Sequence, residues 1–255
     1  MAGSIAPRGR MTTRNVRLQN MQDKIFSIYK PKGPTSFDII RGIQKALGQR
    51  KGIGHAGTLD PLASGVLVIG IGREATKKLG EIVGKEKEYI AKVYLGKTST
   101  TDDEEGEKTE HHVAQIPNRE NIEEVAKTFI GTIMQTPPIY SALKVGGQTA
   151  YSLARKGKNV ELKARPIEIK DIEVLGYEWP ILTLRVETGP GAYIRALARD
   201  IGVKLGVGGA YLADLERTRV GEFTRENSMT PEEAVSKIAA SFSGLHMETK
   251  QNNSP

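Results

Sequence analysis

Apolar and polar residues recur along the chain with two periods, which predict a mixture of strands and helices. Alternation or short apolar runs predict strands at residues 24–29, 65–70, 88–95, 167–174, 181–186 and 212–223. Helical periodicity predicts helices at residues 37–47, 121–129 and 193–205. Thr35 or Ser36 is expected to cap the first of these helices, and Gly206 to end the last.

The order of these elements bounds the fold. Strands and helices mix without repeats or a long linker, so we expect one α/β (α+β) domain with a large mixed sheet over residues 23–240. Residues 1–22 hold four arginines and no acid, which is typical of a disordered basic tail. A transit peptide, or a true start at Met21, remains open. Residues 241–255 are expected to form a loose polar tail.

Composition restricts the partners, metal sites and cellular compartment to be expected. The 37 lysines and arginines exceed the 30 acids, for a net charge of +7, which suits an anionic partner such as RNA without proving one. There is no cysteine, so disulfides and cysteine-ligated zinc are excluded. The adjacent His111 and His112 make a poor metal site, since neighbouring positions rarely converge on one ion. No apolar run reaches about 18 residues, and no secretory signal is visible; we expect a cytoplasmic protein.

One segment carries the clearest chemistry. Residues 54–67 read GHAGTLDPLASGVL and place Asp60 between a glycine-rich turn and the predicted strand at 65–70. Pro61 fixes its own φ and favours extended geometry at Asp60, and the glycines allow a close backbone approach to a ligand. A carboxylate on such a support can act as a nucleophile or base. On its own, a Thr-Leu-Asp-Pro sequence is more typical of an aspartate that merely caps a turn.

The whole segment closely resembles the catalytic motif of the TruB-type tRNA pseudouridine-55 synthases. Five further segments resemble that family in order: KPKGPTS at 30–36; KEYIA at 87–91 with Leu95, Gly96, Thr101, Asp103 and Gly106; QTPPIYSALK at 135–144 with the residues that follow; YIR at 193–195; and a last motif containing Leu212, Leu215, Arg217, Thr218, Gly221 and Phe223. The resemblance covers about residues 24–225.

The resemblance implies a pseudouridine-synthase-like fold, with a mostly antiparallel sheet, and an isomerase that needs no metal or other cofactor. The reaction cleaves the bond from uracil N1 to ribose and rejoins the base through C5. By resemblance, Asp60 is the nucleophile or base, Arg195 pairs with it, and Tyr89 stacks on the flipped base and takes the C5 proton. His55 holds space in the RNA loop, and Tyr193 and Leu212 wall the uracil pocket.

The expected partner is tRNA, bound through its T-arm by a monomer, with no membrane. Basic residues near the catalytic loop are expected to contact phosphates: Lys32, Arg41, Lys45, Arg50, Lys51, Lys77 and Lys78. Without the resemblance, Arg195 reads as a helix-surface residue near Arg199 and Asp200, and Tyr89 as a core residue.

The chain departs from the family pattern at two places. Residues 189–192 read GPGA where many members have a Ser-Lys-Gly-Thr type sequence. Only 32 residues follow Phe223, too few for the C-terminal RNA-binding domain that many members carry, so recognition of the T-arm alone is expected. A guide-dependent, dyskerin-like synthase and a non-catalytic tRNA-binding chaperone are the alternative readings.

Overall fold

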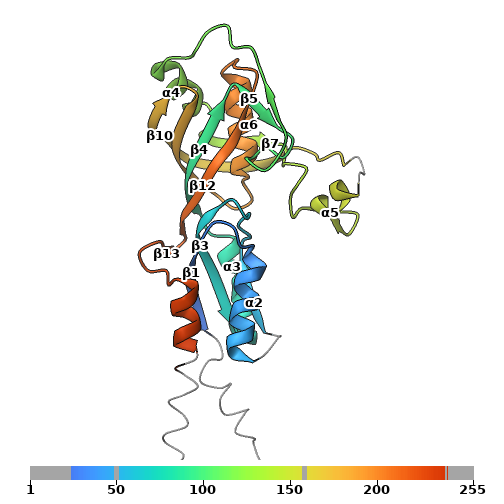
Figure 1. Cartoon of the computed structure of the whole chain (residues 1–255), viewed down its shortest axis with the longest axis vertical. Coiled ribbons are helices and arrows are strands. Elements are labelled where there is room, and N and C mark those ends of the chain that lie inside the picture. The colour runs from blue at the N-terminus through green and yellow to red at the C-terminus, as the bar shows by residue number, and fades with distance from the viewer. Residues whose placement is uncertain (1–23, 49–51, 157–159, 239, 241–255) are drawn as a thin grey trace, which may run out of the picture.

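The predicted strands pair into one sheet in the computed structural model, which describes residues 24–48, 52–156, 160–238 and 240 (Figure 1). Within these residues the sheet has nine strands, and seven of them run in the order β1 (Lys24–Lys30), β3 (Ser64–Ile71), β12 (Ala210–Val220), β4 (Lys87–Leu95), β11 (Ile181–Thr188), β10 (Arg165–Glu178) and β7 (Gly131–Gln135). β2 (Ile53–Ala56) flanks β3, and β13 (Phe223–Thr224) flanks β12. Only β3 and β12 pair in parallel, so the predicted mixed, mostly antiparallel sheet is confirmed.

The apolar run of β3 is explained by burial on both faces of the sheet. Leu67 and Ile69 join the main core with the apolar side of α2 (Ser36–Leu47). Val66 and Val68 point the other way and pack with α3 (Arg73–Val83) in a second cluster. Because successive side chains in a strand point to opposite faces, a strand covered on both sides reads as continuously hydrophobic.

The predicted helices are present with small shifts in their ends. α2 begins after Thr35, whose side chain accepts from the backbone of Asp38 while Asp38 accepts from Thr35, a reciprocal cap. α4 (Arg119–Lys127) packs against β10, and α6 (Ile194–Lys204) packs against β12. Gly206, just after α6, adopts φ +72°, as a helix-ending glycine does.

Several elements were not predicted. These are α3, β2, β7, the hairpin of β5 (Lys97–Ser99) and β6 (Lys108–Glu110), the hairpin of β8 (Lys144–Val145) and β9 (Gln148–Thr149), α5 (Ala150–Arg155) and helical residues 231–238. Helices 73–83 and 231–238 are short and polar over most of their surface, so their apolar signal is weak. The segment with α5 leaves the sheet and lies apart from it, as Figure 1 shows.

Strand β12 holds the two ends of the molecule together. Figure 1 shows α2 and α3 around β1 and β3 at one end of the long axis, and α4 and α6 at the other, with β12 running between them. It meets β3 through only two residue pairs, of which one joins Arg217 to Gly65. A Cβ added to Gly65, at φ +114°, would lie 2.1 Å from the carbonyl oxygen of Arg217. Only glycine therefore allows this contact.

Some expectations fall outside the described residues. Both predicted tails, 1–22 and 241–255, lie there, as do Arg50 and Lys51. Among the described helices, none combines the length and the apolar character that crossing a membrane requires.

Candidate active site

A cavity of about 560 Å³ opens where the loop between β2 and β3, strands β4 and β12, and the start of α6 converge. Its polar lining includes Asp60, Lys87, Tyr89, Arg195 and Arg217. The segment that carries α5 contributes further residues of the wall: Tyr140, Ser141, Ala142 and Thr149. Sequence segments far apart thus supply one concave, charged site.

The loop that carries Asp60 is fixed by hydrogen bonds to the first residue of α2 and to the chain before it. The hydroxyl of Ser36 donates to the carbonyl of Leu59 at 3.0 Å and accepts from its amide at 2.9 Å. The amide of Gly33 donates to the carbonyl of Pro61 at 2.8 Å. The turn itself closes through the amide of Ala63, which donates to the carbonyl of Asp60. The KPKGPTS segment therefore supports the catalytic loop from behind.

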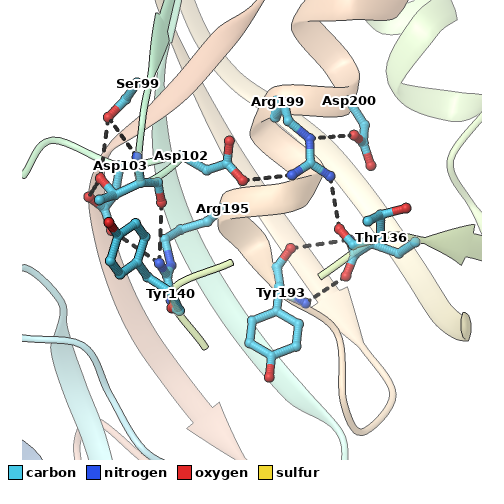
Figure 2. Close-up of polar contacts among 11 residues, drawn as sticks. Ser99, Asp102, Asp103, Thr136, Tyr140, Tyr193, Arg195, Arg199 and Asp200 are labelled. Atoms are coloured by element: carbon cyan, nitrogen blue, oxygen red, sulfur yellow. Dashed lines mark hydrogen bonds and ion pairs between the residues drawn. The ribbon is translucent and has the colours of Figure 1, made fainter. Parts of the chain in front are cut away.

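The predicted ion pair between Asp60 and Arg195 is present. Nε of Arg195 lies 3.1 Å from Oδ2 of Asp60, and the arginine side chain is 7% exposed. Its remaining nitrogens bind the carboxylate of Asp103 at 3.4 Å and the carbonyls of Thr101 and Tyr140 at 3.2 and 2.8 Å (Figure 2). The guanidinium is thus held in one orientation, and its charge is balanced by two carboxylates.

The surroundings of Asp60 change its acidity. Burial raises the pKa of the Asp60 carboxyl, the neighbouring Arg195 opposes the rise, and the nearby Asp103 adds to it. The Asp60 side chain still exposes 39% of its surface. A carboxylate of raised basicity that remains open to the cavity has the properties of a nucleophile or base.

Tyr89 lies at the cavity beside a buried arginine. The tyrosine is 7% and Arg217 2% exposed, and their side chains are close enough to interact. Burial raises the pKa of Tyr89, which keeps the phenol neutral, while Arg217 opposes that rise. Arg217 also donates from Nε to the carbonyl of Val66 at 2.8 Å and from a terminal nitrogen to that of Gly57 at 3.0 Å. It therefore joins β12 to β3 and to the catalytic loop.

Two buried lysines stand close to the catalytic loop. Lys30 donates to the carbonyls of Pro31 and Pro34 at 2.9 and 2.8 Å, and burial lowers its pKa to about 8. Lys87 caps the end of α3 by donating to the carbonyls of Val83 and Lys85 at 2.9 and 2.7 Å, and burial lowers its pKa to about 8 as well. Only Lys87 lines the cavity.

Tyr193 lines the cavity as predicted and immediately precedes α6. The side-chain amide of Gln135 fixes the backbone of Tyr193. Its Oε1 accepts from the Tyr193 nitrogen at 2.9 Å, and its Nε2 donates to the Tyr193 carbonyl at 3.1 Å. The guanidinium of Arg165 lies 5.4 Å from the centre of its ring, a cation–π contact.

The apolar wall predicted at Leu212 lies instead at Leu215. Leu212 is fully buried in the core and does not line the cavity, whereas Leu215 does. A bulge between Leu212 and Asp214 places both leucines on the same face of β12: Leu212 pairs with Val93, and Leu215 pairs with Ala91, one step nearer the active site.

His55 and Lys32 are not brought to the cavity lining. His55 lies half-buried on β2, where burial and the charge of Arg217 lower its pKa, so its ring is neutral near pH 7. Lys32 is exposed and pairs with Asp214 at 2.7 Å. The other predicted phosphate contacts within the described residues are exposed: Arg41 and Lys77 pair with Asp38 and Glu74, and Lys45 and Lys78 lie on α2 and α3.

The unusual segment at 189–192 forms part of the cavity rim. Gly191, at φ +84°, and Ala192 line the cavity. A terminal nitrogen of Arg165 donates to the carbonyl of Gly191 at 2.7 Å. The backbone and Arg165 thus shape this rim without the lysine and threonine of the family pattern.

Asp103, Arg217, Lys87 and Leu215 belong to the site but were not among the predicted site residues. All four lie in the motif segments, so their presence there was the available signal. What the sequence could not show is their burial around Asp60. A second arginine on α6, Arg199, lies beyond the site: it pairs with Asp102 at 2.6 Å and Asp200 at 3.0 Å (Figure 2).

Comparison with known proteins places these features in a family. Residues 44–194 match the family model described as TruB family pseudouridylate synthase, N-terminal domain. The chain is 47% identical over 215 residues to the tRNA pseudouridine synthase B of Parabacteroides distasonis, a match that covers 82% of this chain and 91% of that protein. It is 43% identical over 230 residues to the enzyme of that name from Thermobifida fusca, with 87% and 76% covered.

Solved structures show the same fold. The crystal structure of a Cbf5-Nop10-Gar1 complex superposes with a TM-score of 0.66 at 30% identity, over 88% of this chain and 56% of that one. An H/ACA RNP bound to a substrate RNA containing 2'-deoxyuridine gives a TM-score of 0.63 at 29% identity, over 86% and 54%. This chain thus spans little more than half of each. Together with the sequence matches, these findings show that the chain belongs to the TruB family of pseudouridylate synthases.

Proposed function

We propose that this protein isomerises uridine 55 in the T-loop of tRNA to pseudouridine. One observation carries the proposal: a carboxylate of raised basicity, Asp60, is held by Arg195 at a cavity that Tyr89 also lines. The relatives that share 43–47% identity are named tRNA pseudouridine synthase B, which supports tRNA as the substrate.

The cavity suits one nucleoside taken out of its RNA. A base in a folded loop must be extruded to reach Asp60, at a cost of roughly a few kcal/mol. Stacking on an aromatic ring such as Tyr89 returns about 1–3 kcal/mol per base. Tyr193 adds a second aromatic wall and Leu215 an apolar one. These surfaces can hold the uracil while its bond to ribose changes.

The reaction exchanges one bond for another. The bond between uracil N1 and ribose C1′ breaks, the base turns, and a bond between C5 and C1′ forms. C5 loses its proton and N1 gains one, so the product is an isomer of the substrate. Asp60 acts as the nucleophile or base that starts this sequence. Tyr89 stacks on the base, and its oxygen lies near Arg217, which favours acceptance of the C5 proton at the end.

The simplest test uses the protein alone. Unmodified tRNA is incubated with the purified protein, and pseudouridine is mapped chemically; the proposal expects it at position 55 and nowhere else in quantity. Absence of pseudouridine without an added guide RNA would contradict the proposal and favour a guide-dependent enzyme. Formation at a different position would show that the substrate assignment is wrong.

We also propose that the protein acts as a monomer on the T-arm. The exposed lysines of α2 and α3 lie on helices that flank the β2–β3 unit, and such charges suit recognition of phosphates and RNA shape. An isolated T-arm hairpin should then be converted with kcat/KM within about tenfold of full-length tRNA, a difference of about 1.4 kcal/mol. The comparison requires one fixed salt concentration. A hairpin more than a hundredfold worse would refute recognition by the T-arm alone.

A further inference from the structure

Two buried cations line the cavity without a carboxylate partner. Lys87 is 7% exposed and Arg217 is 2% exposed. Their hydrogen bonds go to backbone carbonyls, and Arg217 also lies close to the phenol of Tyr89. Neither forms an ion pair with any acid in the part of the chain that the structure describes, although the charge of Asp60 acts on Arg217 from nearby. Arg195, by contrast, is balanced by Asp60 and Asp103.

The two cations are neighbours on one side of the catalytic loop. A Cβ built on Gly57 would lie 3.4 Å from a terminal nitrogen of Arg217 and 3.8 Å from Cε of Lys87. Gly57 therefore lies against both side chains, three residues before Asp60. Arg217 pairs in register with Tyr89 on β4, and Lys87 lies two residues before Tyr89 on the same face. Both cations therefore lie beside Tyr89, whose ring is expected to stack on uracil.

Burying these two charged side chains lowers the stability of the fold, so we expect their charge to serve a function. Burying a cation without a counter-ion costs several kcal/mol even after the protein relaxes. Hydrogen bonds to carbonyls could be made by neutral donors at lower cost. A structural role, capping α3 and joining β12 to β3, explains the hydrogen bonds of these two residues but leaves their charge unexplained. The nearby carboxylate of Asp60 is already paired with Arg195, so two further cations at the cavity indicate that additional negative charge enters it.

The reaction supplies that charge on the base. When the bond between N1 and C1′ breaks, its electron pair stays with uracil, and the charge spreads over N1 and the two carbonyl oxygens. Addition of a nucleophile at C6 would also place charge on a carbonyl oxygen, so the argument holds for each chemical route. The charge disappears when C5 bonds to C1′, its proton leaves to a base, and N1 takes up a proton.

We propose that Lys87 and Arg217 form an electropositive wall that stabilises negative charge on the uracil while it is detached from, or loosened from, the ribose. The inference rests on the proposed function and specifies how the same cavity lowers the barrier. Preorganised donors that point at developing charge are each worth about 10²–10³-fold in rate, and fixed positive charges beside it act in the same sense. The wall acts on the transition state, and therefore on rate more than on affinity.

The first experiment separates charge from hydrogen bonding at Lys87. Lys87→Gln keeps donors for the carbonyls at the end of α3 but removes the charge, and Lys87→Arg keeps the charge. Lys92→Gln, an exposed position on the same strand, is the matched control. Single-turnover rates at saturating enzyme, tRNA dissociation constants and melting temperatures are measured for each variant.

The expected pattern is specific. Lys87→Gln should lower the single-turnover rate 10- to 1000-fold while the dissociation constant stays within about threefold. Lys87→Arg should recover most of the rate, and Lys92→Gln should match the wild type. A Lys87→Gln protein that weakens affinity but keeps its rate would overturn the proposal and indicate a contact with bound RNA, such as a phosphate. Equal losses in both Lys87 variants would also overturn it.

A second measurement guards against a variant that only distorts the site. A tRNA carrying 4-thiouridine at position 55 presents a base that leaves more readily as an anion and keeps its C5 proton. The rate deficit of Lys87→Gln should be smaller on this substrate than on uridine, since less charge needs support. The same deficit on both substrates would show that Lys87 does not act on the leaving base. If the wild-type protein were inactive on tRNA, the proposed function itself would be refuted, and this inference with it.

Discussion

Asp60 meets Arg195 through one nitrogen, Nε, at 3.1 Å, and the other two nitrogens of the guanidinium are committed elsewhere. They bind Asp103 and the carbonyls of Thr101 and Tyr140. The arginine thus orients the catalytic carboxylate and fixes two neighbouring loops at once. No single-nitrogen cation can make all of these contacts.

Arg195→Lys is therefore expected to lower kcat by at least a hundredfold. Lysine keeps the charge but leaves buried acceptors at Thr101 and Tyr140 without a donor. Arg199→Lys, one turn later on α6, is the matched control, since Arg199 does not line the cavity. Steady-state rates on tRNA check the expectation. If Arg195→Lys keeps most of its rate, the ion pair does not position Asp60.

Asp60→Asn should abolish turnover while leaving tRNA affinity within a few fold. Asparagine has nearly the same shape but can neither attack nor accept a proton as a carboxylate does. Pseudouridine formation and binding are measured on one preparation, with Asp171→Asn, in an exposed ion pair on β10, as control. Turnover near that of the wild type would rule out Asp60 as the nucleophile or base.

Leu215→Ala and Leu212→Ala should have opposite signatures. Leu215 lines the cavity, so its truncation should raise KM or lower kcat with a moderate loss of stability. Leu212 is fully buried away from the cavity, so its truncation should cost about 2–5 kcal/mol of stability with little effect on the rate of the folded protein. Thermal unfolding and steady-state kinetics of both variants test this contrast. The reverse pattern would place the uracil against Leu212.

As the pH is lowered, kcat/KM should begin to fall at a higher pH than it would with an aspartate of ordinary pKa. Burial raises the pKa of Asp60, and only its ionised form is active, so kcat/KM rises as pH increases through that pKa. Asp103 contributes to the raised value, so the residual activity of Asp103→Asn should have its acid limb at lower pH. A limb that moves to higher pH in that variant would assign it to another group.

Gly65→Ala should destabilise the protein severely. The new Cβ would meet the backbone of Arg217 at 2.1 Å, and φ +114° is strained for alanine. Gly80→Ala, within α3 and with open space around it, should be neutral or stabilising by about 0.5–1 kcal/mol. Melting temperatures of the two variants test the pair. A Gly65→Ala protein with normal stability would mean that β3 and β12 can separate without cost.

Much of the fold could be predicted because its strands and helices bury one clear face. Strands 24–30, 87–95 and 181–188 and helix 36–47 have the expected periodicity and lie where the pattern placed them. Edge strand β7 was missed because its exposed residues include Met134 and its apolar signal is weak. Segment 73–83 was missed because most of its residues are polar.

The site was predictable from its motifs but not its three-dimensional details. Residues Arg217 and Arg219 would share one face of a regular strand, yet Arg217 is buried and Arg219 reaches Glu86 and Glu187 at the surface. A register shift between them, like the one after Leu212, separates their environments. Bulges of this kind depend on the partner strand, and no local pattern in the sequence reports them.

The position of β12 has a consequence for synthesis of the protein on the ribosome. This strand lies between β3 and β4 in the sheet, yet its residues, 210–220, are translated long after both of them. A nascent chain that already contains Asp60 and Tyr89 still lacks β12, the strand that joins β3 to β4. Helix α6, which carries Arg195, is translated immediately before β12. Such non-local pairing folds late. The catalytic carboxylate therefore meets its arginine only after α6 and β12 have been translated, and chains that stop before them lack the assembled site.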